Sequence, residues 1–331
     1  MFFALGIFNN QDYILLHDES IVVDAHCDTL TAMLEQQRHL GEFSGKGHLD
    51  LPRLRTGGIK VQFFAAFIAP KFKQFALHRA LELIDLYYRE IEANNKDIVH
   101  IESLAGIYDA LTSGKIAALL SVEGGEALEC RLDVLRMLYH LGVRSLTLTW
   151  NKRNELGDGV LEGNTGGGLT SFGLAVVKEL NRLGILVDVS HLSEKGFWDV
   201  LKYSKQPVMA SHSNCQAICA HPRNLNDQQI KALAEEGGVM GITYVPDFLG
   251  GKAASVNEVL DHIDHAVSIG GMNCVGLGSD FDGMVQTPSG LEDCSKISVI
   301  TRGLIERGYH HSAVKKILGD NFLRIIKQVL K

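Results

Sequence analysis

The stretch VVDAHCDTL, residues 22–30, places two metal-binding side chains directly behind an apolar run. His26 and Asp28 stand two positions apart, so on an extended segment both point to the same side and could bind one ion. Cys27 lies between them and is expected to face the opposite way, into the packing of the strand. The pair alone is weak evidence, because polar residues often follow a strand for structural reasons.

Four further ionisable residues close apolar runs later in the chain, namely Glu123, His191, His212 and Asp280. Three imidazoles, with Asp28 and Glu123 as carboxylates, suit a two-metal site in which a carboxylate bridges ions about 3.5–4 Å apart. Structural alternatives remain for single members: Glu123 could cap a following helix, and His191 could merely precede a helix. His212, in ASHSN, has no obvious packing role.

Other polar residues have simpler explanations. Asp188 is better explained as a structural strand carboxylate than as a ligand. His262 and His265 lie one helical turn apart and could bind a metal, but the polar face of an outer helix accounts for them more simply. His310 and His311 are expected in solvent.

The elements that must position these residues alternate between short apolar runs and segments of helical period, which is typical of a parallel sheet. Eight such runs are present: IVVDAH, KVQFFAAFI, IAALLSVEG, SLTLTW, GILVDVSH, PVMASHS, GVMGITY and CVGLGSD. Eight strands close a (β/α)8 TIM barrel, in which the carboxyl ends of all strands share the face that carries active sites. An open doubly wound sheet is the alternative.

Helices are predicted between the runs, several with a recognisable first residue. Candidate N-caps are Thr170 or Ser171, Ser193, Asn226 and Asn257. Gly184 is predicted to end the helix that begins near residue 171. The Gly-rich segment LEGNTGGGLTSFG lacks the Lys-Ser/Thr that completes a phosphate-binding loop, so it is interpreted as an ordinary loop.

Composition narrows the class of protein further. The chain has 331 residues, a formal net charge of −7 and 46% hydrophobic residues, which predicts one barrel domain, residues 1–331, with a short N-terminal extension, about 1–20. No basic surplus favours a nucleic-acid partner. No Lys or Arg precedes Arg38, no apolar run approaches ~18 residues, and six cysteines are too sparse for a disulfide framework. We therefore expect a cytoplasmic protein without membrane attachment.

The sequence resembles the membrane (renal-type) dipeptidases, peptidase family M19, which are zinc-dependent amidohydrolase-like barrels. The resemblance covers nearly the whole chain and rests on several long motifs: DAHCDT, HLDLPRLRTGGIKVQFFA, SVEGG, LTLTWN, LTSFGLAVVKELNRLGILVDVSH, SHSN followed by HPRNLND, VGLGSDFDG and LGDNFLRI.

The resemblance implies a metallo-dipeptidase with two Zn²⁺ ions and a metal-bridging hydroxide as the attacking group. It makes His26 and Asp28 ligands of one zinc, His191 and His212 ligands of the other, and Glu123 the bridging carboxylate. The chemistry agrees, because zinc lowers the pKa of bound water towards ~7 and polarises a carbonyl.

The resemblance also implies the substrate contacts. Arg223 matches the arginine that grips the carboxylate of a dipeptide, for which its planar fork is suited, and Asp280 matches the aspartate that meets the amino end and handles protons. Trp150 stands where animal members of the family have a substrate-binding histidine. It could pack on the substrate side chain, with Asn151 or Asn154 supplying a hydrogen bond, or simply cover the barrel mouth.

The family resemblance further implies a dipeptide substrate, often with a D-residue at its carboxyl end, and a possible homodimer. Two alternatives remain open at the level of sequence. One is a related metal-dependent hydrolase of another amide, such as an N-acyl amino acid or a lactam. The other is a peptide-binding barrel with weak turnover, which the tryptophan at position 150 would explain.

Overall fold

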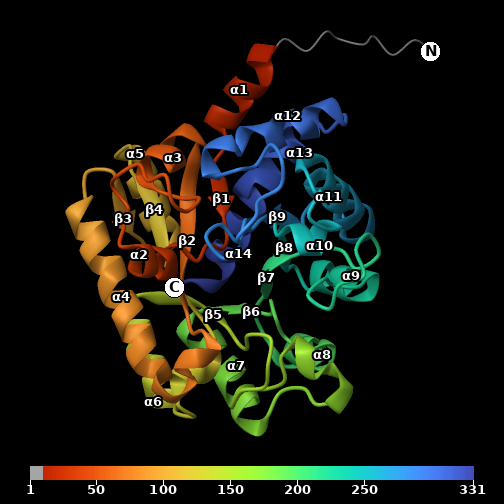
Figure 1. Ribbon diagram of the computed structural model, residues 1–331. Coiled ribbons are helices and arrows are strands. Elements are labelled where there is room, and N and C mark those ends of the chain that lie inside the picture. Colours follow the sequence, from red (N-terminus) through yellow and green to blue (C-terminus); the bar gives the residue numbers. More distant parts are fainter. Residues whose placement is uncertain (1–9) are drawn as a thin grey trace.

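The computed structural model describes residues 10–331. The predicted N-terminal extension, about residues 1–20, lies partly outside the described residues. Its described part forms helix α1 (Asn10–Glu19), which packs beside α12 (Ser298–Glu306) at one end of the molecule (Figure 1). The described part of the extension therefore packs against the C-terminal part of the chain.

The described strands form one parallel sheet, and each of the eight predicted apolar runs overlaps one of them. The strands are β1 Val22–Asp24, β2 Ile59–Phe67, β3 Ile98–His100, β4 Ile116–Glu123, β5 Val143–Thr147, β6 Leu186–Asp188, β7 Met209–Ser213, β8 Val239–Ile242 and β9 Val275–Leu277. Only β3 was not predicted. It pairs with the first three residues of β4, outside the ring of eight.

The sheet closes on itself because strands far apart in the sequence pair at two places. β1 pairs with β2 on one side and with β9 on the other, and β2 pairs with β4 over most of its length, from Val61↔Ala117 to Phe67↔Glu123. The remaining strands, β4 to β9, follow in sequence order. The (β/α)8 barrel is confirmed, and the open doubly wound alternative is wrong.

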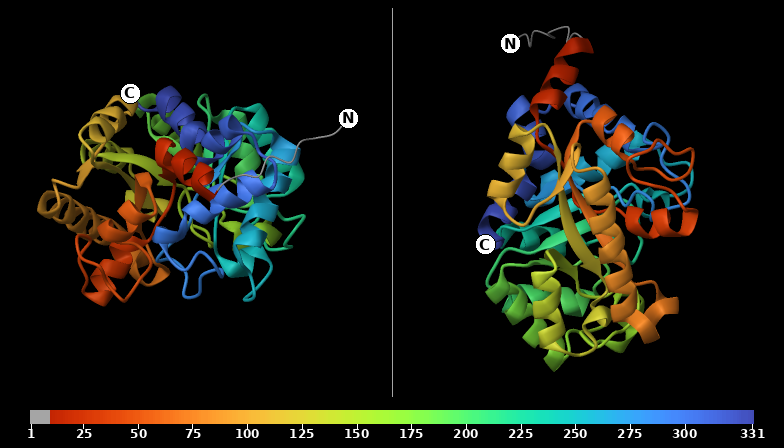
Figure 2. Two further views of the ribbon diagram at one scale, coloured as in Figure 1. Left: turned by 90° about the horizontal axis from the view of Figure 1, so that it is seen from above. Right: turned by 90° about the vertical axis from the view of Figure 1, so that its left-hand side faces the viewer.

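Helices cover the outside of the barrel (Figures 1 and 2). Besides α1 and α12 they are α2 Thr29–Gln36, α3 Leu51–Thr56, α4 Ala76–Ala93, α5 Leu104–Thr112, α6 Leu132–His140, α7 Ser171–Leu183, α8 Glu194–Tyr203, α9 Asp227–Glu235, α10 Pro246–Leu249, α11 Val256–Gly270 and α13 His311–Lys315. The last helix, α14 Asn321–Val329, has a different place. Since both faces of a parallel barrel are covered, its strands can be apolar throughout.

Most predicted helix starts are confirmed. Thr170, Ser193 and Asn226 each accept a backbone N–H two or three residues into their helix, as an N-cap does. Asn257 was wrong: α11 is capped by Ser255, which forms a reciprocal capping box with Glu258.

The lower half of the barrel interior is closed by α14. Alternate strand residues such as Phe63 and Leu119 face inward and form one apolar cluster with Phe322, Ile325 and Ile326 of this helix. A packed floor at the amino-terminal end of the strands leaves the carboxyl-terminal end as the open face.

Candidate metal centre

The upper half of the barrel interior is polar, because the inward alternation along β4 continues to its last residue. Glu123 shares the inner face with Ser121 and Leu119, so its carboxylate points into the barrel. The residue is only 2% exposed. A buried carboxylate needs strong partners to remain charged.

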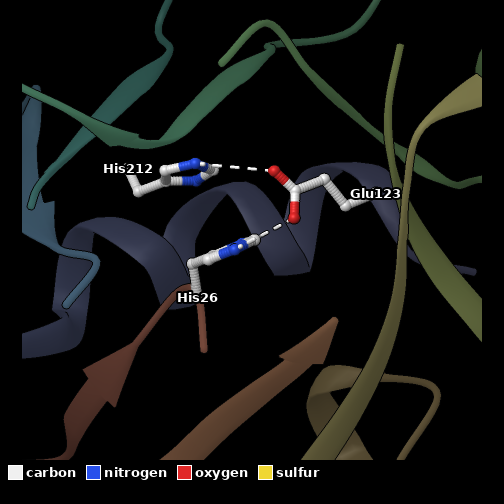
Figure 3. A group of neighbouring side chains, drawn as sticks. All are labelled: His26, Glu123 and His212. Atoms are coloured by element: carbon white, nitrogen blue, oxygen red, sulfur yellow. Dashed lines mark ion pairs between the residues drawn. The ribbon is translucent and has the colours of Figure 1, made fainter. Parts of the chain in front are cut away.

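Three imidazoles from three other strand ends supply those partners. Oε2 of Glu123 lies 3.4 Å from Nε2 of His26, and Oε1 lies 3.0 Å from Nε2 of His191 and 3.8 Å from Nε2 of His212. Figure 3 shows the rings of His26 and His212 stacked beside each other, both reaching towards the carboxylate; their centroids are 3.8 Å apart. Each oxygen of Glu123 therefore faces a different imidazole.

Two further carboxylates lie near His26. Oδ2 of Asp28 and Oδ1 of Asp280 each lie 3.9 Å from its Nε2. Potential ligand atoms thus form two overlapping groups, each with its atoms within 4.8 Å of one another: His26 with Glu123 and His212, and His26 with Asp28 and Asp280.

The atoms at the centre of these groups lack protein partners. Nε2 of His26 and Oδ1 of Asp28 are fully buried and make no hydrogen bond within the described residues. Unsatisfied buried polar atoms are costly, and a divalent cation bound by imidazole and carboxylate would satisfy them. The donor set fits a metal ion. It contains no sulfur, because the buried Cys27 thiol donates to the carbonyl of Phe63.

The carboxylates differ in their electrostatic environment. Burial raises the pKa of Asp28 above its usual value and raises that of Asp280 well above it, with the charges of neighbouring carboxylates adding to the effect. Burial also acts on Glu123, but the positive charge of His26 outweighs it and brings its pKa below the usual range. A bound cation would lower all three values.

The pKa values of the three imidazoles also shift in different directions. Burial and the nearby Arg223 lower the pKa of His191 to about 4, and burial together with the charge of His26 lowers that of His212 well below its usual value. Burial opposes the charged form of His26 as well, yet Glu123 and the other carboxylates raise its pKa well above the usual value. His191 and His212 are therefore neutral at pH 7, the form in which imidazole binds a metal.

Two of these residues have a backbone conformation that residues other than glycine rarely adopt. His191 has φ = +66° and Asp280 has φ = +64°, in the left-handed region. Such conformations cost of order 1–3 kcal/mol each and persist only where surrounding contacts hold them. The carbonyl of His191 accepts from the N–H of Val160, and the N–H of Asp280 donates to the carbonyl of His26. No pattern in the sequence pointed to these two conformations.

A cavity of about 480 Å³ opens above the centre. Its polar floor contains Asp28, Glu123, His191 and Asp280, and its walls include Phe67, Trp150, Val245, Met284 and Val285. The ring of Trp150 packs against Phe67, at 5.5 Å between centroids, and against His191, at 5.9 Å. Trp150 therefore lines the side of the cavity as well as its opening.

The two asparagines considered for substrate binding have other partners. Oδ1 of Asn151 lies 2.7 Å from Nδ1 of His191, although Asn151 also lines the cavity. Asn154 is buried and folds its own loop, accepting from the N–H groups of Leu156 and Gly157 and donating to the carbonyl of Leu148. Asn154 therefore has a structural role in its own loop.

Arg223 lies close to the centre but behind it. It lines a neighbouring cavity of about 180 Å³, which shares His191 with the main cavity, and its Nη2 donates to the carbonyl of His212 at 2.9 Å. Burial lowers its pKa to about 10, opposed by the charges of Asp280 and Glu123, so the guanidinium stays charged at pH 7. Its buried Nε has no partner within the described residues.

Sequence reasoning missed Gly283 in the centre. A Cβ at this position would lie 2.2 Å from Oδ1 of Asp280 and 2.4 Å from Oδ2 of Asp28. The glycine in SDFDG was visible, but only the fold shows that it lies against both carboxylates.

Fold and site together define a class: a TIM-barrel enzyme with a buried imidazole and carboxylate centre at the carboxyl ends of its strands. Residues 11–331 match the family model described as membrane dipeptidase, peptidase family M19. The chain belongs to this family and is a metallo-dipeptidase; the other-amide and weak-binding alternatives are not favoured.

Solved structures agree with this assignment. A metallo-peptidase of family M19 described as dipeptidase AC is 30% identical, with a TM-score of 0.89 over 94% of this chain and 99% of that chain. A metallo-peptidase from Rhodobacter sphaeroides, bound to a phosphinate mimic of the dipeptide L-Ala-D-Ala, is 29% identical, with a TM-score of 0.88 over 94% of this chain and 100% of that chain. The probable dipeptidase PvdM from Pseudomonas aeruginosa, 23% identical, has the same fold, with a TM-score of 0.90 over 97% and 98%.

Within residues 10–331, every helix is too short or too polar to cross a bilayer.

Proposed function

We propose that this metallo-dipeptidase holds two zinc ions and hydrolyses L,D- as well as L,L-dipeptides. The observation that carries the proposal is the position of Glu123, whose two oxygens face different imidazoles at 3.4 and 3.0 Å. A carboxylate turned to both sides in this way can bridge two ions. Imidazole nitrogen and carboxylate oxygen are ligands that zinc accepts.

In this proposal each side chain has one task. His26 and Asp28 hold one ion, His191 and His212 hold the other, and Glu123 contacts both. Bound zinc would supply a water of lowered pKa and polarise the scissile carbonyl. The unpartnered oxygen of Asp28 and the unpartnered Nε2 of His26 support the first of these ion positions.

Asp280 and Arg223 are proposed to act on the substrate itself. Asp280 lines the cavity, and burial raises its pKa, so its carboxyl group is suited to take a proton and pass it to the leaving amine. Arg223 is charged, and its Nε has no partner within the described residues, so it keeps a donor that a substrate carboxylate could accept from. Trp150 is proposed to contact the substrate side chain.

The proposed activity on L,D-dipeptides rests on similarity. The Rhodobacter sphaeroides metallo-peptidase was solved with a mimic of L-Ala-D-Ala, and it shares 29% identity with this chain. We also propose a cytoplasmic location, because all six cysteines are free thiols, and a homodimer on the family resemblance alone.

A metal-titrated assay tests this function. The chelated protein is titrated with Zn²⁺ while hydrolysis of matched L,L- and L,D-dipeptides is measured. Activity should rise to a plateau at two ions per chain, and Asp280→Ala should abolish most of it. Asp247→Ala is the matched control, because Asp247 lines the same cavity away from the centre. A plateau at one ion, or full activity in Asp280→Ala, would contradict the proposal.

A further inference from the structure

A chain of hydrogen bonds leads away from the metal centre behind His212. Its Nδ1 lies 2.7 Å from Oγ of Ser211, and the Ser211 hydroxyl donates to Oδ2 of Asp188 at 2.6 Å. A hydroxyl has a single proton to donate. Since that proton goes to the carboxylate, Oγ must accept from Nδ1–H of His212, which leaves the lone pair of this ring on Nε2.

Hydrogen bonds hold the Asp188 carboxylate in place, and so it fixes which way the protons point along this hydrogen-bonded chain. Oδ1 accepts from the backbone N–H groups of Ser190, at 3.0 Å, and Ser211, at 2.9 Å, while Oδ2 also accepts from the hydroxyl of Thr147 at 2.5 Å. These partners come from β5, β7 and the turn after β6, and Asp188 is 1% exposed. Four donors from three adjacent segments leave the carboxylate no freedom to rotate.

His191 has an independent partner with the same effect. The side-chain oxygen of Asn151, which can only accept, lies 2.7 Å from Nδ1 of His191. Nδ1 therefore carries the proton, and the lone pair on Nε2 points at Glu123. The Nε2 atoms of His191 and His212 are 2.8 Å apart, so both lone pairs converge on one point beside the carboxylate.

We propose that Asn151 and the Asp188–Ser211 pair are positioning residues, which hold His191 and His212 in the Nδ1–H tautomer and thereby set the affinity of the ion that these two histidines bind. This inference deepens the proposed function and rests on it for the presence of two ions. The ligands proposed for the other ion, His26 and Asp28, make no hydrogen bond to Asn151, Ser211 or Asp188, whose contacts are with His191 and His212. The effect should therefore be confined to one of the two ions.

Zinc titration of the chelated protein, followed by calorimetry, tests this selectivity. In Ser211→Ala and in Asn151→Leu, one of the two zinc equivalents should lose about 10- to 100-fold in affinity, while the other stays within twofold of wild type. Asn151→Asp keeps an accepting oxygen and should retain both equivalents. Ser145→Ala is the matched control, because it removes a buried strand hydroxyl that has no partner within the described residues.

Equal weakening of both ions in Ser211→Ala and Asn151→Leu, or no weakening of either, would overturn the inference. Nitrogen-15 NMR of the histidines in the zinc-loaded wild-type protein at pH 8 provides a test that needs no variant. Wild-type His191 and His212 should both carry the proton on Nδ1, and a proton on Nε2 of either would overturn the inference. If the wild-type protein bound one zinc only, the proposed function would fail while the tautomer measurement still decided this inference.

Discussion

Gly283 is the residue at which the smallest change should damage the centre most. A methyl group there would lie within 2.4 Å of carboxylate oxygens of both Asp28 and Asp280, so at least one of them must move. Displacements of about 1 Å can cost ~10²-fold in rate. We expect Gly283→Ala to lower kcat/KM by about that factor while circular dichroism shows an intact fold.

The control for this change is Gly45→Ala. No atom lies within 4 Å of the position of its Cβ, and its backbone is not left-handed. Wild-type activity in Gly283→Ala would mean that Asp28 and Asp280 tolerate displacement, which would contradict their proposed roles.

Trp150 can be tested by the division between binding and turnover. If its ring only contacts the substrate side chain, Trp150→Ala removes binding that is equal in ground and transition states. The loss of about 1.5–3 kcal/mol of apolar contact should then raise KM at least tenfold with little change in kcat. Trp198→Ala on α8, away from the cavity lining, should leave both constants unchanged. A fall in kcat alone would indicate instead that the packing of Trp150 on His191 is what matters.

Six of the seven positions proposed for metal, proton and carboxylate binding were predictable at this scale, because residue type and place behind a strand are both visible in the sequence. Arg223 was predicted from the family resemblance alone. The partners of Asn151 were not predictable. Its contact with His191 joins two loops that are 40 positions apart, and only the closed barrel brings them together.

At the scale of elements, α11 is hydrogen-bonded to the loop that carries Arg223. His262 of α11 is fully buried, so the predicted polar outer face was wrong for this residue. Its Nδ1 accepts from the N–H of Cys215 at 3.0 Å, at the start of that loop, and its Nε2 lies 3.3 Å from the carbonyl of Leu249. If Nδ1 also carried a proton, that proton would point at the N–H of Cys215, and the hydrogen bond would be lost. The ring therefore stays neutral in the folded protein.

This arrangement predicts a pH-dependent stability. Burial lowers the pKa of His262 to about 4, whereas an unfolded chain has about 6.5. Between these values the unfolded state binds the extra proton, so the free energy of unfolding falls as the pH falls from about 6.5 to 4. Urea denaturation from pH 7 to 4.5 should show a shallower pH dependence in His262→Gln than in wild type, by up to about 1.4 kcal/mol per pH unit.

His265→Gln, one turn along α11, is the control for this measurement. His265 is only partly buried, and its Nε2 pairs with Asp227 at 2.8 Å. If His262→Gln and wild type lost stability in parallel as the pH fell, the buried neutral ring would not be the source of the effect.

For the whole molecule, periodicity was enough to predict the barrel, since eight buried strands and their helices leave a repeated pattern. The floor formed by α14 was not predicted. Its amphipathic segment, LRIIKQVLK, was visible, but periodicity alone does not tell a helix that packs on the outside of a barrel from one that closes its end. The contact of Phe322 with Gly276 of β9, where a Cβ would lie 2.3 Å from the ring, settles the question.

This division of the barrel into a structural floor and a catalytic face leads to opposite effects of mutation at its two ends. Phe322 is 0% exposed, so Phe322→Ala should lower the free energy of unfolding by about 3–5 kcal/mol, while kcat/KM of the folded protein stays near wild type because the centre lies at the other end of the strands. Phe75 is 59% exposed, so Phe75→Ala should change the free energy of unfolding by less than about 0.5 kcal/mol. Urea denaturation and assays well below the melting temperature measure the two quantities separately. A loss of kcat/KM in folded Phe322→Ala as large as that of Gly283→Ala would mean that the floor and the metal centre are mechanically coupled through the strands.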